Sequence, residues 1–563
     1  MKTYKILAKS VGVAALVFAG ACSDKDIIEL QPQTALSDAT AYQTPERMEL
    51  VAAGMYDAAQ SGFYLGGAVR GYPFGAAHVE QGDNRGEDVV NTQAFYQVTY
   101  TSAYDPTTAN NDYHFQTLFS LINRVNVALA GFETAVPTAT LTQATIDAYK
   151  GEARFLRALA YHELLKHFCR PYSDNPTAAN GGMPYKLKGA SGAASANESV
   201  AQSRGTVAED YTNILADLDY AETVLPKTRT GGLKITRATY GAAIALKTRI
   251  YLHMGNWAAV VTEANKLVPT SISGTVASLN GTGYTLPSNP YAAFSAASSK
   301  NNTESIFSID NDVTDNPGVN GALPSMYNTS VAPTTGRALV AISPILWNQS
   351  WWNSTDTRKT STFVNINVEL PGGGGKGGFF TKKYTDVVGG SDNAPIIRYA
   401  EVLLNLAEAI QRQAIGSPDA RAFAAYNAVR SRANAAGTDA NYDQISDFAT
   451  GQALLTAILN ERRIEFVCEG QRWADIHRLA QDATNNTWGG GIPLKVGNGV
   501  TNLQPLYTTA TNPNGATNLA AILATTGGRQ LAIPYTDFRF LWPIPSSETI
   551  LNPIMAAQQN PGW

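Results

Sequence analysis

A helical periodicity that recurs in paired blocks is the sequence feature that most constrains the fold. In residues 237–268, small Ala and Gly residues alternate with large apolar ones on both sides of a turn at residues 254–257. Apolar residues three to four apart form one face of a helix, and a short turn between two such blocks folds them into an antiparallel pair. The segment therefore predicts a tetratricopeptide-like helical hairpin.

Similar blocks occur along most of the chain. Residues 398–413 and 420–432 form a second predicted pair, residues 452–481 a further helical arm, and residues 146–168 and 207–225 the first pair. Several such hairpins without a strict period are typical of a scaffold whose repeats have diverged. The fold class predicted is mainly α, with tetratricopeptide-like helical hairpins forming a scaffold and long interspersed loops between them.

The start of the chain predicts a lipoprotein signal peptide at residues 1–21. A lysine-bearing start precedes an apolar stretch too short to span a bilayer, and small residues lead into Cys22. We expect Cys22 to carry lipid, and residues 23–26 resemble an acidic tag that directs lipoproteins to the outer face of the outer membrane. The alternative is an ordinary secretory signal followed by an incidental cysteine.

Composition excludes several other classes of protein. The 42 Lys and Arg residues are balanced by 46 Asp and Glu residues, so no basic surface suits nucleic acid. The two cysteines beyond the signal, Cys169 and Cys468, are more consistent with separate buried thiols than with a disulfide, although pairing stays open. We expect no cofactor, because no dinucleotide or phosphate-binding fingerprint is present.

Two groups of residues suggest catalysis or metal binding at first sight. His162 and His167 are five residues apart, about 140° around a helix, so they do not share a metal as histidines four apart do. A charge cluster on one predicted helix has an arginine within three or four residues of every carboxylate, which favours a structural ion-pair network over acid catalysis. Its members are Glu461, Arg462, Arg463, Glu465, Glu469, Arg472, Asp475 and Arg478. No catalytic or metal-binding residue is predicted.

Several motifs of the chain resemble those of a known protein family. The chain resembles the SusD/RagB family over nearly the whole mature sequence, and the matching motifs follow the family's order. They lie at residues 151–158, with Tyr161 and Phe168 after them, and at residues 398–408, 460–466, 469–475, 541–545 and 560–562. The resemblance divides the mature chain into an N-terminal region at residues 22–235 and a C-terminal region at residues 236–563, which form one intertwined globular body.

The resemblance implies a function. Members of this family are helical nutrient-binding lipoproteins at the outer-membrane surface, and they act as lids on TonB-dependent SusC-like transporters. Their ligands are usually oligosaccharides, and some members bind peptides instead. We therefore expect a binding protein anchored by lipid and not an enzyme. A peptide-binding member, a surface glycoside hydrolase and a purely structural scaffold are the alternatives.

A glycoside hydrolase would need an isolated carboxylate in an aromatic cleft, where its pKa is raised for acid catalysis. Glu80, Asp83, Glu87 and Asp88 form the one loop cluster that approaches this, with Arg85 among them. A loop of solvated charge is the favoured interpretation.

Ligand-binding residues are predicted from chemistry alone. Pyranose rings stack on flat aromatic side chains, while their hydroxyls need polar partners in the same cleft. Two of the long polar and aromatic segments, residues 63–111 and 271–362, offer both kinds of side chain, and a third lies at residues 485–529. The candidates are Tyr64, Tyr72, Phe74, Asp83, Asn84 and Arg85 in the first segment, and Trp347, Trp351 and Trp352 in the second. Alanine substitution of a stacking residue is expected to weaken binding without lowering stability.

Overall fold

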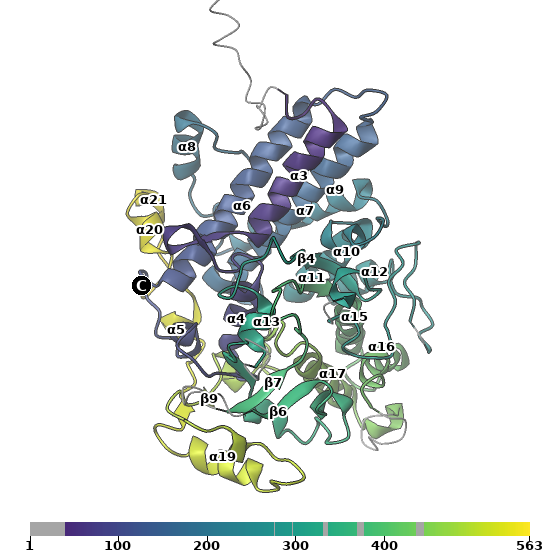
Figure 1. Ribbon diagram of the computed structural model, residues 1–563, viewed down its shortest axis with the longest axis vertical. Helices are drawn as coiled ribbons and strands as arrows, with labels where there is room; N and C mark the ends of the chain where they lie inside the picture. The colour runs from purple at the N-terminus through teal and green to yellow at the C-terminus, as the bar shows by residue number, and fades with distance from the viewer. Residues whose placement is uncertain (1–39, 275, 295–296, 330–335, 369–376, 435–443) are drawn as a thin grey trace, which may run out of the picture.

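The computed structural model describes residues 40–274, 276–294, 297–329, 336–368, 377–434 and 444–563. Long helices occupy the upper half of the molecule, and shorter helices mixed with strands and loops occupy the lower half (Figure 1). This confirms a mainly α fold. The predicted signal peptide and Cys22 lie outside the described residues.

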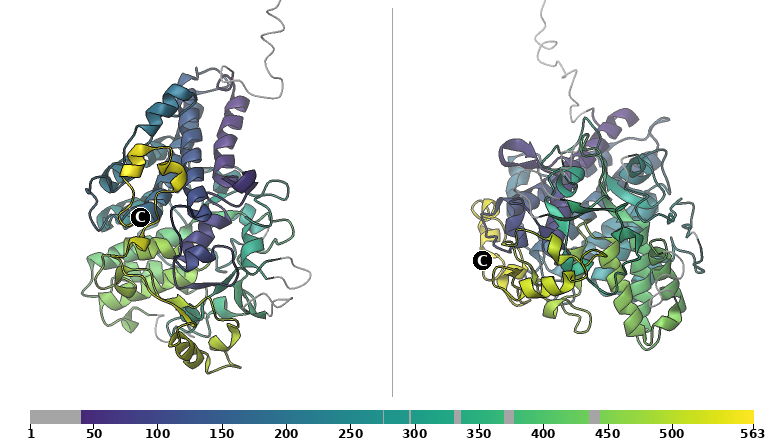
Figure 2. Two further views of the ribbon diagram at one scale, coloured as in Figure 1. Left: turned by 90° about the vertical axis from the view of Figure 1, so that its left-hand side faces the viewer. Right: turned by 60° about the horizontal axis from the view of Figure 1, so that its bottom comes forward.

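Four long helices lie side by side in the upper half (Figures 1 and 2). They are α3 (Pro45–Gln60), α6 (Ala109–Thr134), α7 (Gln143–Phe168) and α9 (Val207–Val224). The pairing of α7 with α9 confirms the first predicted hairpin. Their facing apolar side chains belong to one large core that continues into the lower half of the molecule.

Local sequence explains where two of these helices begin. The Thr142 side chain accepts a hydrogen bond from the Thr145 backbone N–H at the start of α7. At the start of α9, Thr206 and Glu209 bond reciprocally to each other's backbone N–H groups. These capping side chains satisfy donors that the first helical turn leaves unpaired, so the helix starts are fixed by single residues.

The predicted pairs of the central chain are confirmed. Residues 237–268 form α11 (Tyr240–His253) and α12 (Trp257–Ala264), and the second pair forms α15 (Tyr399–Gln413) and α16 (Ala420–Arg430). The turn between α11 and α12 contains Gly255, whose φ of 69° favours glycine. The hairpins pack on one another, since α15 contacts α11, α12 and α16.

One predicted helix was wrong in extent. Residues 452–481 form two helices, α17 (Gly451–Glu465) and α18 (Arg472–Arg478), separated by a sharp change of backbone direction. Cys468 and Gly470 have φ values of 65° and 75° there. A Cβ atom on Gly470 would lie 2.8 Å from the Val79 Cα, so the break lets the backbone of another helix approach closely. The predicted charge cluster therefore spans two helices.

The predicted loop at residues 63–111 also contains a helix, α4 (Ala76–Asn84). Every residue of α4 is buried, including Glu80, Asp83 and Asn84. A helix that is buried on all sides has no polar face, so its sequence lacks the periodicity that reveals amphipathic helices. The prediction of a solvated loop here was wrong for that reason.

The strands form small antiparallel sheets. The largest has the order β3 (Val89–Asn91), β5 (Val340–Ile342), β7 (Gly378–Thr381) and β6 (Val364–Val368). The strands β4 (Ser305–Ile309) and β8 (Ala394–Arg398) pair separately. Shorter elements are β1 (Phe63–Tyr64), β2 (Ala68–Val69), β9 (Lys495–Val496), β10 (Arg529–Gln530), α5 (Gln97–Tyr100), α8 (Ala193–Val200), α10 (Leu233–Thr236), α13 (Leu323–Tyr327), α14 (Pro344–Trp347), α19 (Gly515–Leu523), α20 (Ser546–Thr549) and α21 (Pro553–Ala557).

The C-terminal segment packs back against the N-terminal helices. The Trp542 backbone N–H donates to the His167 carbonyl at 2.9 Å. The Asn560 side-chain amide donates to the Phe168 carbonyl at 2.8 Å and to the Trp542 carbonyl at 2.7 Å. Arg204 binds the same segment through the Asn560 side-chain oxygen at 2.9 Å. The end of the chain thus completes the surroundings of α7.

Two further expectations concern the cysteines and the membrane. Cys169 and Cys468 are both buried and free, which confirms separate thiols. Among the residues that the structure describes, no helix combines the length and the apolar character needed to cross a bilayer.

Candidate functional site

The first predicted segment places Tyr64 at the surface, on the hairpin of β1 and β2. Its ring stacks on Tyr72, with centroids 5.9 Å apart and planes 7° apart, and contacts Tyr113 at 4.7 Å. Phe63 packs edge-on against Tyr113 at 6.0 Å. Buried Tyr72 supports Tyr64 from behind, so the exposed part of the Tyr64 ring is held in one orientation.

Two arginines flank these rings. The Arg70 guanidinium lies 4.9 Å from the Tyr64 centroid and 5.2 Å from the Phe95 centroid, and the Arg337 guanidinium lies 4.3 Å from the Phe95 centroid. Arg337 also donates to the Asn320 side chain. Within the described residues, neither arginine has a carboxylate oxygen within 4.0 Å. We call Phe63, Tyr64, Arg70, Phe95, Tyr113 and Arg337 the Tyr64 surface.

Glu80 lies beneath the Tyr64 surface. Its side chain is fully buried, and neither carboxylate oxygen has a hydrogen-bond partner in the described part of the chain. Burial raises the pKa of Glu80 well above its ordinary value, against the opposing charge of Arg337. Burial thus disfavours the charged form of Glu80, and Glu80 makes no ion pair with Arg70 or Arg337.

The other candidates of the first segment are buried. Asp83 accepts hydrogen bonds from the Tyr327 hydroxyl at 2.8 Å and from the Gly470 backbone N–H at 3.0 Å. Arg85 stacks on Trp473, with its guanidinium 3.4 Å from the ring centroid. Tyr72, Phe74, Asp83, Asn84 and Arg85 present no open surface in this structure. Their contact with a ligand stays a prediction. Because truncating a buried side chain destabilises the fold, the expectation that alanine substitution leaves stability unchanged does not hold for these residues.

The candidates of the second predicted segment also differ in burial. Trp347 and Trp352 are buried, pack against each other at 5.4 Å and enclose the Lys359 ammonium group. Trp351 is half-buried, and the Arg463 guanidinium lies 5.3 Å from its ring centroid. The adjacent residues Trp351 and Trp352 therefore occupy different environments, as expected for neighbours in a non-helical segment.

Arg463 also lines a cavity that the sequence did not reveal. The cavity measures about 330 Å³ and lies between α17, α18 and residues 484–488. Trp488 lines this cavity, and 52% of the Trp488 surface is exposed. The other lining residues are Thr456, Leu459, Asn460, Arg472, Asp475, Leu479, Thr484, Asn485, Asn486 and Thr487. We call this the Trp488 cavity.

The backbone at Trp488 is unusual. Trp488, Gly489 and Gly490 have φ values of 53°, 69° and 85°, in the left-handed region. A bulky residue seldom adopts this conformation, and such strain is often found at functional sites. The sequence signal was a tryptophan followed by the three glycines at residues 489–491.

The arginines of the Trp488 cavity are paired with buried acids. Arg463 binds both Asp88 and Glu87, and Arg472 binds Glu87 at 2.6 Å. Although burial acts to raise it, the pKa of Glu87 is lowered to about 2 by Arg472 and Arg463. The prediction that Glu87 and Asp88 are solvated was wrong, because they are the counter-charges of this cavity.

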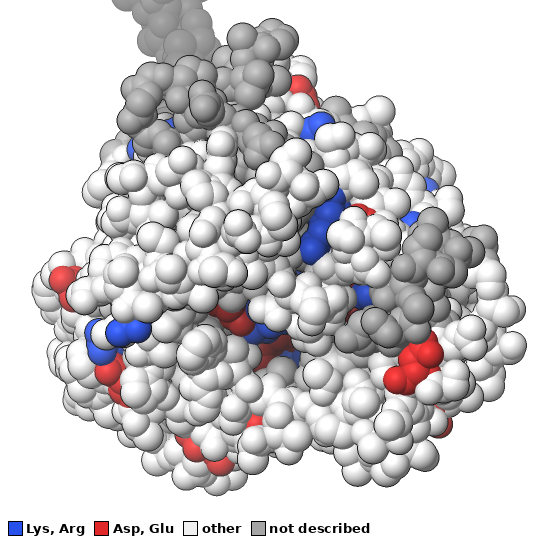
Figure 3. Space-filling model, turned by 90° about the horizontal axis from the view of Figure 1, so that it is seen from below, with Lys and Arg blue, Asp and Glu red and all other residues white. Residues whose placement is uncertain are grey.

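The predicted charge cluster is a buried ion-pair network. Glu465 binds Arg398 at 2.9 Å and Arg358 at 3.0 Å, and Asp475 binds Arg462 at 3.0 Å. This confirms the structural interpretation of the cluster. From below, most of the described surface is uncharged, and charged side chains gather in a central hollow (Figure 3). The protein therefore keeps much of its charge inside.

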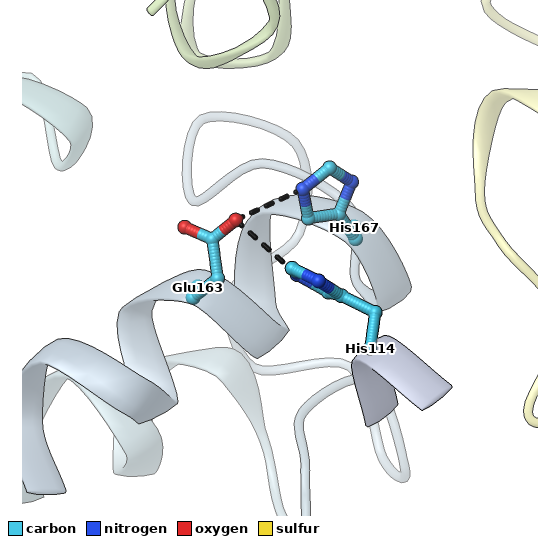
Figure 4. A group of neighbouring side chains, drawn as sticks. All are labelled: His114, Glu163 and His167. Atoms are coloured by element: carbon cyan, nitrogen blue, oxygen red, sulfur yellow. Dashed lines mark hydrogen bonds and ion pairs between the residues drawn. The ribbon is translucent and has the colours of Figure 1, made fainter. Parts of the chain in front are cut away.

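One group of side chains in the described residues has the spacing of metal ligands: His114, Glu163 and His167. His114 comes from α6, and Glu163 and His167 lie four apart on α7, so all three converge (Figure 4). The His167 Nε2 lies 3.1 Å, and the His114 Nε2 3.4 Å, from one Glu163 oxygen. His162 packs against His253 with ring centroids 4.6 Å apart, as expected for a histidine that does not share a metal with His167.

The surroundings of this group do not suit a cation. The Lys166 ammonium group binds the second Glu163 oxygen. Arg85 lies 3.3 Å from the His167 Nδ1, and because an arginine only donates, that nitrogen accepts and the Nε2 carries the proton. A protonated Nε2 donates to Glu163 and has no lone pair for a metal. We interpret the group as a polar hub that joins α6 to α7.

Comparisons with known proteins agree with the fold. A family model described as "SusD family" matches residues 348–563, and one described as "Starch-binding associating with outer membrane" matches residues 51–252. Together the two models cover most of the described chain.

Individual relatives give the same result. The SusD-like protein P2 of Formosa agariphila is 26% identical over an alignment 372 residues long. The alignment covers 59% of this chain and 65%, just under two thirds, of that protein. A SusD superfamily protein from Bacteroides fragilis is 26% identical with a TM-score of 0.70, covering 91% of this chain and 99% of that one. The surface glycan-binding protein A from Bacteroides uniformis shares the fold at 17% identity and a TM-score of 0.64, covering 92% and 99%.

Proposed function

Because this chain belongs to the SusD/RagB family, we propose that it is a lipid-anchored binding protein of the outer membrane that captures glycans at the cell surface and delivers them to a SusC-like TonB-dependent transporter. A relative of the same fold is described as a surface glycan-binding protein, which supports the ligand class. The resemblance in the sequence supports the transporter, and Cys22 is the proposed site of the lipid.

The Tyr64 surface is the observation that carries this proposal. A half-buried tyrosine supported by a stacked buried ring offers part of the flat apolar face on which a pyranose packs. The guanidinium groups of Arg70 and Arg337 lie close to these rings and can donate hydrogen bonds to hydroxyl or acidic groups of a ligand. Since neither guanidinium group has a carboxylate partner among the described residues, we propose that the preferred oligosaccharides carry carboxylate or sulfate groups.

Calorimetry with neutral, uronate-containing and sulfated oligosaccharides tests the ligand class. We expect acidic oligosaccharides to bind and Tyr64→Ala to weaken that binding by about 1 to 3 kcal/mol, comparable to loss of a stacked base. Tyr220→Ala is the matched control, because Arg154 lies 4.1 Å from the Tyr220 ring elsewhere on the molecule. Equal losses from both variants would show that the Tyr64 surface has no special role. Peptides in the same titration test the peptide-binding alternative.

The anchor and the transporter have their own tests. Mass spectrometry of the mature protein should show a lipid-modified N-terminus at Cys22, and a chain beginning elsewhere contradicts the anchor. Pull-down from detergent-solubilised membranes should recover a large barrel protein. Recovery of the lipoprotein alone would contradict the lid role and leave a free-standing binding protein.

Glu80 is the observation that keeps a hydrolase as the second candidate, since its raised pKa suits a general acid. However, its buried carboxyl group has no access to substrate in this structure. Incubation with the oligosaccharides that bind should leave them intact. Sugar release that Glu80→Gln abolishes would replace the binding role with catalysis.

A further inference from the structure

We propose that the Trp488 cavity is a second saccharide-binding site, which takes a neutral sugar residue and is separate from the Tyr64 surface. The inference rests on the proposed glycan-binding function. The two sites share no residue: one is built from β1, α6 and residues near Phe95 and Arg337, the other from α17, α18 and residues 484–488.

Trp488 provides the platform. It is a large aromatic residue with half of its surface exposed beside a cavity, and its indole offers a large flat apolar face on which a sugar ring can pack. The backbone holds it there: a Cβ on Gly490 would lie 2.1 Å from the Ala480 carbonyl oxygen, so Gly490 packs directly against the chain just beyond the end of α18. The indole is therefore positioned before a ligand arrives, which lowers the entropy cost of binding.

The cavity also supplies both hydrogen-bond donors and hydrogen-bond acceptors. The side-chain amides of Asn460 and Asn486 line it and form no hydrogen bond within the described residues. Each amide donates and accepts, as sugar hydroxyls do. By contrast, the Asn485 side chain is already bound to Asp482 and Gln452 and acts as support for the loop.

The charges of the cavity indicate a neutral ligand. Arg463 and Arg472 are balanced by Asp88 and Glu87, and Asp475 is bound by Arg462 and Arg478. An acidic sugar would have to compete with these buried carboxylates for the guanidinium groups. A neutral sugar can use the remaining guanidinium N–H groups without breaking an ion pair.

The size of the cavity agrees with one or two sugar residues. Its volume of about 330 Å³ lies at the lower end of the range for ligand pockets, about 300 to 1,000 Å³. The site is thus a contact point for part of a longer chain, or for a short neutral oligosaccharide.

Titration of the full mature chain with neutral oligosaccharides of gluco, xylo and manno type tests the proposal. We expect Trp488→Ala to lower affinity for a binding neutral oligosaccharide about 10-fold or more, with the unfolding temperature unchanged because the indole is exposed. Trp488→Phe should restore part of the affinity. Trp257→Ala is the matched control, since Arg412 lies 4.6 Å from that half-buried ring on another hairpin.

The outcomes separate the two proposals. If no glycan binds the wild-type chain, both the glycan-binding function and this site are wrong. If neutral glycans bind and Trp488→Ala changes neither affinity nor stoichiometry, the second site alone is wrong. Loss of neutral binding in Tyr64→Ala but not in Trp488→Ala would also overturn it.

Discussion

The Tyr64 surface and the Trp488 cavity use the same kinds of side chain with opposite charge balance. Each puts a partly exposed aromatic ring near two arginines. At the Trp488 cavity, buried Glu87 and Asp88 bind the guanidinium groups, whereas at the Tyr64 surface the nearby Glu80 makes no ion pair with any described residue. We infer that the acids behind a site, and not only the residues that face the ligand, determine which ligand charge the site accepts.

Removing the counter-charge of Glu87 should give the Trp488 cavity the preference for acidic ligands that we propose for the Tyr64 surface. This is the largest expected effect. Glu87→Gln leaves Arg472 and Arg463 short of a partner, and breaking a buried pair costs about 3 to 5 kcal/mol. Urea denaturation measures the loss, and calorimetry should show new binding of acidic oligosaccharides at the cavity. The matched control is Glu198→Gln, which breaks an exposed pair with Lys188 and should change neither property.

Changes in pH should affect the two regions in opposite directions. Glu87 has a folded pKa of about 2, below its unfolded value, so its contribution of about 3 kcal/mol is present above pH 4.5 and lost as pH falls toward 2. Glu80 has a raised folded pKa, so its contribution is present below pH 4.5 and lost as pH rises through that folded pKa.

Denaturation across pH separates these two contributions. The acid-side loss of stability should shrink in Glu87→Gln, and the loss on raising pH should shrink in Glu80→Gln. Identical pH profiles for wild type and both variants would mean that neither carboxyl group is perturbed as the geometry indicates.

Raising the salt concentration should change ligand affinity at the two sites by different amounts, and this effect is smaller than those of Glu87→Gln and of pH. Raising NaCl screens exposed charges, so acidic oligosaccharides should lose about 10-fold in affinity, or about 1.4 kcal/mol, for the Tyr64 surface. Neutral ligands at the Trp488 cavity should be nearly unaffected. Arg337→Gln should reduce the salt dependence of acidic binding, and an unchanged dependence would place the acidic groups elsewhere.

The smallest expected effect concerns the backbone of the Trp488 cavity. Gly489 has a φ of 69° and open space around it, so Gly489→Ala adds only conformational strain, about 1 kcal/mol. Part of that cost should appear as weaker neutral binding, measured by calorimetry. Gly416→Ala, also in open space but without a positive φ, is the control.

The helix α9 could be predicted from periodicity because it buries one face only, and its buried residues Tyr211, Ile214 and Leu218 recur three to four apart. Most of α11 is buried all round, and its hairpin was indicated by the turn at residues 254–257 and the alternation of small and large apolar residues beside it. The same reasoning missed α4, which is buried on every side, and joined α17 to α18, because positive φ at Cys468 is not visible in a periodic pattern.

The candidate site could be predicted only in part. Tyr64 was a predicted candidate because it lies in an aromatic segment, but Arg337, which flanks the same surface, comes from a distant part of the sequence. Burial also decides which side chain can face a ligand: Tyr72 and Tyr64 are alike in sequence context, and only the fold leaves one partly exposed and hides the other. Trp488 was missed because a single tryptophan gives no periodic signal.

The return of the C-terminal segment to α7 has a consequence for how the chain matures. The carbonyls of His167 and Phe168 gain their partners Trp542 and Asn560 only when almost the entire chain is present. Contacts so distant in sequence form late, and incomplete helical bundles expose apolar surface. We therefore expect that the packing around the C-terminal end of α7, although α7 lies early in the sequence, is completed late in folding.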